Sequence, residues 1–409
     1  MQFSGPVTMQ TLPPHIRPEM VHPFPFYDGR ITKENPFTTL IPELHRGPEA
    51  FYTLDGYHGL GPIWVFRRFK DMETIYGDTE HFSNKDFSPF AELNGGNWNL
   101  VPAESDLPEH RFHRGMMNPL FTPKRMAALE EHVRGIARES IGRFRDRGEC
   151  EYMSDMAFEF PIAVFLELVG WPKSEMKQYL TWERQLIHPT SIEDMRQGTN
   201  EVIEFLREMI AERRKNLGDD LISYGITTEM DGRRYTEDEL LGFCFNLFIG
   251  GLESVSTNVG WEAYHLATHP DHQAYLRANL DRVPEAVEEL LRAYSAVTTT
   301  RRCIKPVVVN GVQLMPGDQV ALITPLGSND PERFPDPATI KLDRNPRHVT
   351  FGSGIHRCVG APLARRELII AIQELLKALP EFRIKPGAEI QSTISGVFQI
   401  QSLPLVWQT

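Results

Sequence analysis

The chain has 409 residues, which is enough for one large domain or two ordinary ones. Hydrophobic residues make up 41% of it and charged residues 24%, as in an ordinary soluble globular protein. The net charge of −12 argues against nonspecific binding to nucleic acid.

The N-terminus and the cysteines restrict the location and the redox chemistry. The first 20 residues contain no apolar run, so the sequence predicts no signal peptide and no membrane anchor. The four cysteines lie far apart without a C-x-x-C pair, which argues against zinc and iron–sulfur sites and predicts a reducing, cytoplasmic location. No flavin or nicotinamide fingerprint is present, so any electrons must come from another protein.

The N-terminal part has no pattern of a separate domain. Residues 1 to about 60 are rich in proline and aromatic residues, which predicts irregular structure with a short helix. Residues 62–66 (PIWVF) predict a strand, and residues 69–76 predict a helix. Because no internal repeat or low-complexity segment follows, we expect a single domain over residues 1–409.

A loop and a short helix after it carry the first candidate site residues. The Asn- and Gly-rich residues 94–100 predict a loop in which Trp98, with Val101 just beyond it, either lines a pocket or packs as an ordinary buried residue. His110 and Arg114 are four residues apart and therefore share one helix face. Two cations on one face suit a pair of carboxylates, although most such pairs are simply solvated.

Amphipathic patterns then predict a run of helices. We expect them at residues 127–147, 155–170, 174–187 and 192–215. Thr236 and Glu239 form a capping-box pattern at the start of a longer helix. Its residues 240–252 are 13 positions without a charge, too few for a membrane span, so we expect a helix buried in the core.

The middle of this predicted core helix contains residues that are unusual in a buried helix. Gly250 and Gly251 weaken it by about 2 kcal/mol relative to alanine, and Glu253 beside Ser254 places a carboxyl and a hydroxyl where apolar groups belong. Such a local violation is typical of functional sites. Glycines leave room for a ligand, and the acid and the alcohol can relay protons to it. Close packing between helices is the structural alternative.

The region before the last helix contains an acid–base pair, a hairpin and a proline-rich segment. Glu289 and Arg292 lie three residues apart on a predicted helix. Arg301 begins a strand after a threonine-rich stretch, and residues 307–314 predict a hairpin with Asn-Gly in its turn. A proline-rich segment over residues 327–337 leads toward Cys358.

Cys358 lies in a glycine-rich loop, residues 351–360 (FGSGIHRCVG), directly before a predicted helix. The helix dipole and the neighbouring His356 and Arg357 favour its thiolate, and thiolate is one of the known ligands of haem iron. After that helix we expect short strands and turns, with Val397 and Phe398 in a turn that faces the pocket together with Val297.

The string Phe-Gly-x-Gly-x-His-x-Cys-x-Gly resembles the haem-binding loop of the cytochrome P450 family of haem-thiolate monooxygenases. The resemblance implies that Cys358 is the proximal iron ligand of haem b and that His356 contacts a propionate. Residues 106–114 are similar to the C-helix of the family, and Arg301 matches a third position, which implies that His110, Arg114 and Arg301 bind propionates as well.

Residues 250–254 resemble the family's oxygen-activating motif. The resemblance implies that Gly250 and Gly251 lie over the haem and that Glu253 and Ser254 deliver protons to iron-bound dioxygen. Ser254 replaces the usual threonine and lacks its methyl group, so the coupling of electrons to product is in doubt. Glu289, Arg292 and Arg344 match a purely structural network of the family.

Similar strings at residues 12–15, 81–83, 288–292 and 403–407 extend the resemblance over the whole chain and place it close to the camphor 5-monooxygenase branch of the bacterial enzymes. The implied fold is the cytochrome P450 fold, mainly α with a small β-rich region. The implied partners are dioxygen, a small apolar substrate and an acidic [2Fe-2S] ferredoxin with its reductase, acting on a monomer with no nucleic acid and no membrane. A cationic patch of Arg111, Arg114, Lys124, Arg125, Arg365 and Arg366 would attract that ferredoxin, or consist of ordinary solvated charges.

The substrate is predicted from two polar side chains. Trp98 stands where the camphor enzymes have a tyrosine that donates to the substrate ketone, and Asn246 lies one helical turn before Gly250. We therefore predict a terpenoid or norisoprenoid ketone such as an ionone, rather than camphor. A camphor hydroxylase, a peroxide-using oxidant and a non-enzymatic haem protein of the same fold remain alternatives.

Overall fold

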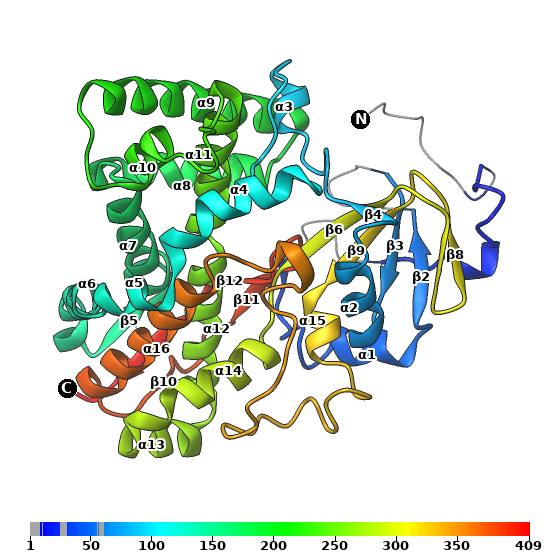
Figure 1. Ribbon diagram of the computed structural model, residues 1–409. Coiled ribbons are helices and arrows are strands. Elements are labelled where there is room, and N and C mark those ends of the chain that lie inside the picture. Colours follow the sequence, from blue (N-terminus) through cyan, green and yellow to red (C-terminus); the bar gives the residue numbers. More distant parts are fainter. Residues whose placement is uncertain (1–8, 10, 25–30, 55, 57–60) are drawn as a thin grey trace.

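Most of the helices lie on one side of the molecule and most of the strands on the other (Figure 1). The computed structural model describes residues 9, 11–24, 31–54, 56 and 61–409. The described part of the N-terminal segment contains a short helix, α1 (Leu40–Arg46), as predicted, whereas residues 25–30 and 57–60 of that segment lie outside it. A mainly α fold with a smaller β-rich region is thereby confirmed.

The largest sheet among the described residues has five strands in the order β2-β3-β9-β6-β4. Strands β3 and β9 are parallel, and the other pairs are antiparallel. Every residue of β3 is buried, which agrees with the strand predicted at residues 62–66. The strands are β2 (Ala50–Thr53), β3 (Ile63–Phe66), β4 (Phe82–Ser83), β6 (Thr298–Cys303) and β9 (Gln319–Ile323).

The described residues also form three smaller sheets. The predicted hairpin is present, with Asn310 and Gly311 at φ of 48° and 74° in its turn, a backbone conformation that favours these two residue types. Its strands are β7 (Val307–Val309) and β8 (Val312–Leu314); one further sheet joins β1 (Ile31–Thr32), β11 (Gln391–Thr393) and β12 (Gln399–Ser402), and another joins β10 (Phe382–Ile384), β13 (Pro404–Trp407) and β5 (Glu149–Glu151).

Most helices follow the predicted pattern, but the helix expected at residues 127–147 and the long core helix are each divided. The single helix expected at residues 127–147 is two helices that meet at Leu129. The helices besides α1, α11 and α12 are α2 (Phe69–Gly77), α3 (Phe90–Leu93), α4 (Glu109–Met117), α5 (Pro123–Ala128), α6 (Glu130–Gly142), α7 (Glu159–Val169), α8 (Met176–Ile187), α9 (Ile192–Lys215), α10 (Leu221–Thr227), α13 (Pro270–Ala278), α14 (Val283–Ala293), α15 (Thr324–Ser328) and α16 (Ala361–Ala378).

The predicted core helix runs through the helical side as two segments, α11 (Glu237–Leu252) and α12 (Ser254–Thr268). Thr236 and Glu239 make both hydrogen bonds of the predicted capping box. The stretch Glu237–Thr268 is long and apolar enough to cross a membrane by composition, but 67% of its most apolar window is buried by the rest of the protein. It is therefore the core helix of a globular fold.

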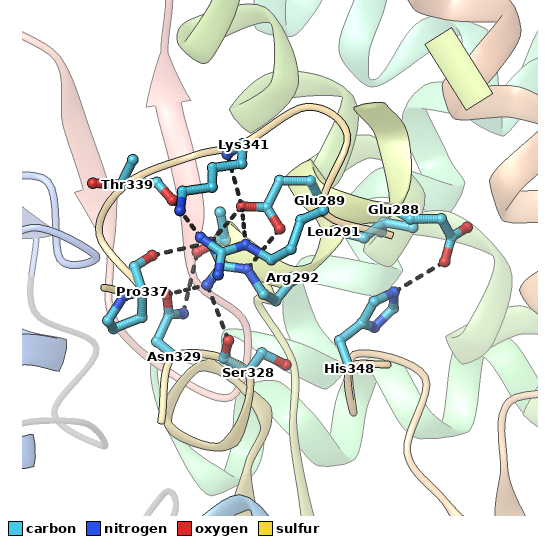
Figure 2. A network of polar contacts seen from close by, with 12 residues as sticks. Glu288, Glu289, Leu291, Arg292, Ser328, Asn329, Pro337, Thr339, Lys341 and His348 are labelled. Atoms are coloured by element: carbon cyan, nitrogen blue, oxygen red, sulfur yellow. Dashed lines mark hydrogen bonds and ion pairs between the residues drawn. The ribbon is translucent and has the colours of Figure 1, made fainter. Parts of the chain in front are cut away.

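A buried ion-pair network holds the segment that leads to Cys358 (Figure 2). Arg292 of α14 is fully buried and makes two 2.9 Å hydrogen bonds to Glu289, and Arg344 donates to the same carboxylate at 3.0 Å. Arg292 also donates to the carbonyl oxygens of Ser328 and Pro337 at 3.2 and 3.0 Å. These contacts tie α14 to residues 328–344, which confirms the structural arrangement predicted for the three charged residues.

Candidate active site

The loop of residues 351–360 presents Cys358 at the start of α16. The Cys358 N–H donates to the Phe351 carbonyl at 2.9 Å and closes the loop. Gly354 has a φ of 69°, and a Cβ built on it would lie 2.2 Å from the Tyr76 carbonyl oxygen, so only glycine fits there. The glycine pattern thus fixes where the sulfur lies.

Cys358 is solvent-accessible, unlike the other three cysteines, which are buried. Burial by the surrounding protein nevertheless raises the pKa of the Cys358 thiol above its ordinary value. The Gly360 and Ala361 N–H groups and the charges of Arg114 and Arg357 act in the opposite direction, as expected from the sequence, but they do not outweigh burial. A bound metal cation would supply the missing stabilisation of the thiolate.

Four basic side chains from three parts of the chain gather near Cys358. The rings of His110 in α4 and His356 in the loop have centroids 4.5 Å apart, and burial lowers their pKa values to about 4 and about 3. Arg301 in β6 is 5% exposed, lies over the Tyr76 ring and donates only to the Thr300 carbonyl among the described residues. Arg114 hydrogen-bonds Asn118.

None of these four groups has a carboxylate at ion-pair distance among the described residues, and the buried Nε2 of His110 has no partner there. A buried guanidinium without an anion is costly. The group therefore lacks a counter-charge, and an anionic ligand with more than one carboxylate would supply it.

One face of α11 and α12 is partly exposed along a stripe of residues. Asn246, Gly250 and Ser254 are four residues apart and all at least partly exposed, although the helix is otherwise mostly buried. A Cβ added to Gly250 would meet nothing within 4 Å, whereas one on Gly251 would overlap the Phe165 ring at 2.3 Å. The structure thus separates the two glycines: Gly250 borders open space, and Gly251 serves packing against α7.

Glu253 occupies the break between α11 and α12, and its side chain contacts His188. It is 5% exposed, and its Oε1 lies 2.6 Å from Nε2 of His188. Burial raises its pKa to about 7. Adjacent helix positions point about 100° apart, so Glu253 and Ser254 face different surroundings, and no hydrogen bond joins them. The acid and the alcohol expected to act as a pair are neighbours without direct contact.

The residues predicted to contact the substrate separate into open and buried ones. Asn246 is partly exposed, and its amide makes no hydrogen bond to any described residue. The Trp98 side chain is 4% exposed, its ring centroid lies 4.9 Å from that of Phe245, and its Nε1–H has no hydrogen-bond partner among the described residues. Val101, three positions later, is also buried. Val297 and Val397 are partly exposed and paired in a β-bridge.

Phe398 does not face the same way as Val397, contrary to prediction. Its side chain is 0% exposed and packs 5.9 Å from the Phe37 ring, and its carbonyl accepts from the Trp261 indole at 2.7 Å. Neighbouring residues of an extended segment point to opposite sides, so only one of the two could face the pocket. The prediction for the side chain of Phe398 is wrong.

Two further side chains contact Glu253 and are not predictable from the sequence. Glu183 at the end of α8 and His188 just after it contact Glu253, from 70 and 65 residues away in sequence. Glu183 has the pattern of an ordinary helix acid and His188 that of a loop residue. No local signal singles them out, because only the tertiary packing of α8 against α11 brings them together.

Comparison with known proteins places these features in a family. The family model "Cytochrome P450" matches residues 162–405. The chain is 33% identical over 407 residues, 98% of both chains, to a protein of Sinorhizobium fredii named probable cytochrome P450 127A1. It is 32% identical to cytochrome P450 monooxygenase PikC of Streptomyces venezuelae, over 85% of both chains. The crystal structure of cytochrome P450 CYP101C1 superposes with a TM-score of 0.85 at 30% identity, covering 97% of this chain and 100% of that one.

Proposed function

The chain belongs to the cytochrome P450 family of monooxygenases, and we propose that its substrate is a small apolar ketone of the terpenoid or norisoprenoid class, such as an ionone. The family gives the reaction class and the haem b cofactor. The observation that carries the substrate class is Asn246, whose unpartnered amide lies on the helix face that Gly250 leaves open.

The residues near Cys358 fit haem. Its two propionates would supply the carboxylates that His110, Arg114, Arg301 and His356 lack, and the accessible Cys358 would bind the iron as its thiolate. The open space beside Gly250 would leave room for a flat ligand next to the helix. When bound, haem activates dioxygen and inserts one oxygen atom into a substrate C–H bond.

The protein's part is to hold protons and to orient the substrate. Glu253 has a pKa of about 7 because it is buried, so near neutral pH it both holds and releases a proton at its carboxyl. Ser254 offers a hydroxyl on the open stripe one residue away. Asn246 donates its amide N–H to the ketone, and Trp98 supplies a second unpartnered donor.

The ketone proposal predicts a selective loss of affinity in an Asn246 variant. N246L keeps the size of the side chain and removes its donors, so an ionone should bind about fivefold more weakly, the loss of about 1 kcal/mol for one hydrogen bond. The hydrocarbon that lacks the carbonyl should bind equally to both proteins. Both affinities are measured by the shift of the haem Soret band on loss of bound water. Equal losses for both ligands, or tighter binding of camphor than of any ionone, would contradict the proposal.

We further propose that an acidic [2Fe-2S] ferredoxin, with its reductase, supplies electrons to a monomeric, cytoplasmic enzyme. Support comes from Arg111 and Lys124, which are exposed and make no ion pair with described residues, and from Arg125 beside them. The cationic patch expected from sequence is smaller, because Arg365 binds Glu288 and Arg366 binds Glu130. Those two charges are already compensated.

Charge reversal of this reduced patch should slow electron transfer. The double variant R111E/K124E should reduce the first-electron rate at least tenfold at low ionic strength and flatten its salt dependence, because steering by opposite charge is lost. Stopped-flow reduction with the ferredoxin measures both. The control is R234E, because Arg234 is an exposed arginine in the connection between α10 and α11. It should change neither the first-electron rate nor its salt dependence. Unchanged rates in the double variant would show that the ferredoxin docks elsewhere.

A further inference from the structure

Three titratable side chains meet at the break between α11 and α12, and the proposed function uses only one of them. Ligand-type atoms of Glu183, His188 and Glu253 all lie within 4.8 Å of one another. His188 Nε2 is 2.6 Å from Glu253 Oε1, and its Nδ1 is 3.4 Å from the hydroxyl of Ser395. One Glu183 oxygen is buried with no partner. The cluster joins the end of α8 to the core helix and to the connection between β11 and β12.

Two carboxyls in this cluster have little water to stabilise two negative charges. Glu183 and Glu253 are 8% and 5% exposed. Burial raises the pKa of Glu183 well above its usual range, the neighbouring Glu253 raises it further, and a hydrogen bond from Glu183 favours the ionised form of Glu253. The charges of His188 and Arg184 oppose this shift without outweighing it, and Asp194 of α9 binds the Arg184 guanidinium at 2.8 Å. Two such carboxyls are not both ionised, so the pair keeps at least one shared proton.

His188 connects this proton pair to the outside. The Glu253 side chain is 6% exposed and that of His188 is 22% exposed, so solvent reaches the cluster at the imidazole. Burial lowers the pKa of His188, with Glu183 opposing and Arg184 adding to the effect, so the ring is neutral at rest. A neutral imidazole takes a proton at one nitrogen and releases one at the other. Its two nitrogens here face Glu253 on one side and Ser395 on the other.

We propose that Glu183 and His188 are positioning residues that return protons from solvent to Glu253, an inference that rests on the proposed function. After Glu253 releases a proton, His188 passes its Nε2 proton to Glu253 Oε1 and takes up another at Nδ1 from the Ser395 side. Glu183 keeps its proton on the carboxyl pair throughout. One proton enters and one leaves, no electron moves, and the cluster returns to its initial charge.

A divalent cation is a poorer occupant of this cluster than a proton. It would require both carboxyls to be ionised, and no fourth His, Cys, Asp or Glu joins these three among the described residues. The short contact between His188 and Glu253 also leaves no gap for an ion between them. The shared proton accounts for the same geometry without a missing ligand.

Infrared titration tests the shared proton without substrate or turnover. In the wild type, a protonated-carboxyl band should disappear as the pH rises through neutrality. E183Q and H188Q should each shift the midpoint of this band, because each removes a group that interacts with the titrating Glu253 carboxyl. Glu262 provides a matched control, because it is another carboxyl that burial keeps protonated, on α12 and outside the cluster. E262Q should remove a band that does not titrate near neutral pH and should leave the other band unchanged.

Stability gives a second readout that is independent of turnover. The unfolded pKa of Glu183 is about 4.5 and its folded pKa is higher, so the unfolded state loses its proton first as the pH rises. The stability that Glu183 contributes is complete below about pH 4.5 and decreases as the pH rises toward the folded pKa. E183Q should therefore gain stability relative to the wild type between pH 5 and pH 8, in a series of urea unfolding curves.

Turnover then tests the relay itself. With the ketone as substrate, E183Q and H188Q should each lower the product formed per electron about tenfold, change the pH profile and increase the solvent isotope effect. E262Q should match the wild type. An unchanged infrared titration in E183Q, or wild-type coupling and pH profile in both cluster variants, would overturn the relay. If the wild type does not oxidise ketones but the infrared band titrates as described, the substrate proposal fails and the shared proton stands.

Discussion

Replacing Cys358 with alanine should abolish the strongly red-shifted Soret band of the reduced carbon monoxide complex and reduce substrate oxidation below detection. No other thiol can take its place, because the remaining three cysteines are buried. Burial also raises the pKa of Cys150 to about 12 and that of Cys303 to about 11. A cysteine binds iron as its thiolate, so neither of these protonated thiols can substitute. The absorption spectrum and the haem content of the purified variant measure the effect.

Cys150 is the matched control for this experiment. It is a buried free cysteine in the middle of β5, and C150A should give the wild-type spectrum and activity. A red-shifted band that persisted in C358A would exclude Cys358 as the ligand. A wild-type spectrum like that of histidine-ligated haem would contradict the thiolate assignment altogether.

Local signals in the sequence were enough to predict most of the secondary structure. The capping box at Thr236 and the Asn310-Gly311 turn each depend on residues within four positions of one another, and both are present. The helix expected at residues 192–215 has those bounds in the structure. The helix expected to begin at residue 127 is preceded by a separate helix that begins at Pro123, because Thr122 caps it and Pro123 occupies its first turn.

The parts of the site that could be predicted are those in which a short motif sets both the backbone conformation and the positions of the charged side chains. The spacing of His110 and Arg114, and the glycines around Cys358, indicated neighbouring groups that the fold indeed places together. The motif did not distinguish Gly250 from Gly251, because only the tertiary structure shows that Phe165 fills the space beside one of them. The sequence also does not show how strongly the protein buries the Cys358 thiol. The helix dipole and nearby cations predict a lowered thiol pKa, whereas burial raises it.

Contacts across long sequence distances were the part that the sequence could not give. Glu288 and Arg365 are 77 positions apart, and Glu130 and Arg366 are 236 apart, so two arginines assigned to a ferredoxin patch turned out to be paired internally. The same limit applies to Glu183 and His188 beside Glu253. Side chains of this kind have ordinary local patterns, and their role depends on which helix packs against which.

Replacing Glu289 with glutamine should destabilise the protein by roughly 3–5 kcal/mol, because it leaves the buried guanidinium of Arg292 without a counter-charge. Glu289 and Arg292 are both fully buried, and the Glu289 carboxylate also accepts from Arg344 and from the Lys341 N–H at 3.0 and 3.1 Å (Figure 2). The midpoint of urea unfolding measures the loss. Because this network anchors residues 328–344 ahead of the Cys358 loop, the variant should also lose haem faster.

Glu285 separates this effect from the loss of a helix acid in general. It lies one turn earlier on the same helix, and its pair with Arg282 is about half exposed on both sides. Exposed pairs contribute little because water screens them, so E285Q should keep the wild-type unfolding midpoint and haem-release rate. If E289Q behaved like E285Q, the buried network would not support the loop. If E289Q lowered the midpoint but released haem at the wild-type rate, the network would stabilise the fold without holding the haem ligand in place.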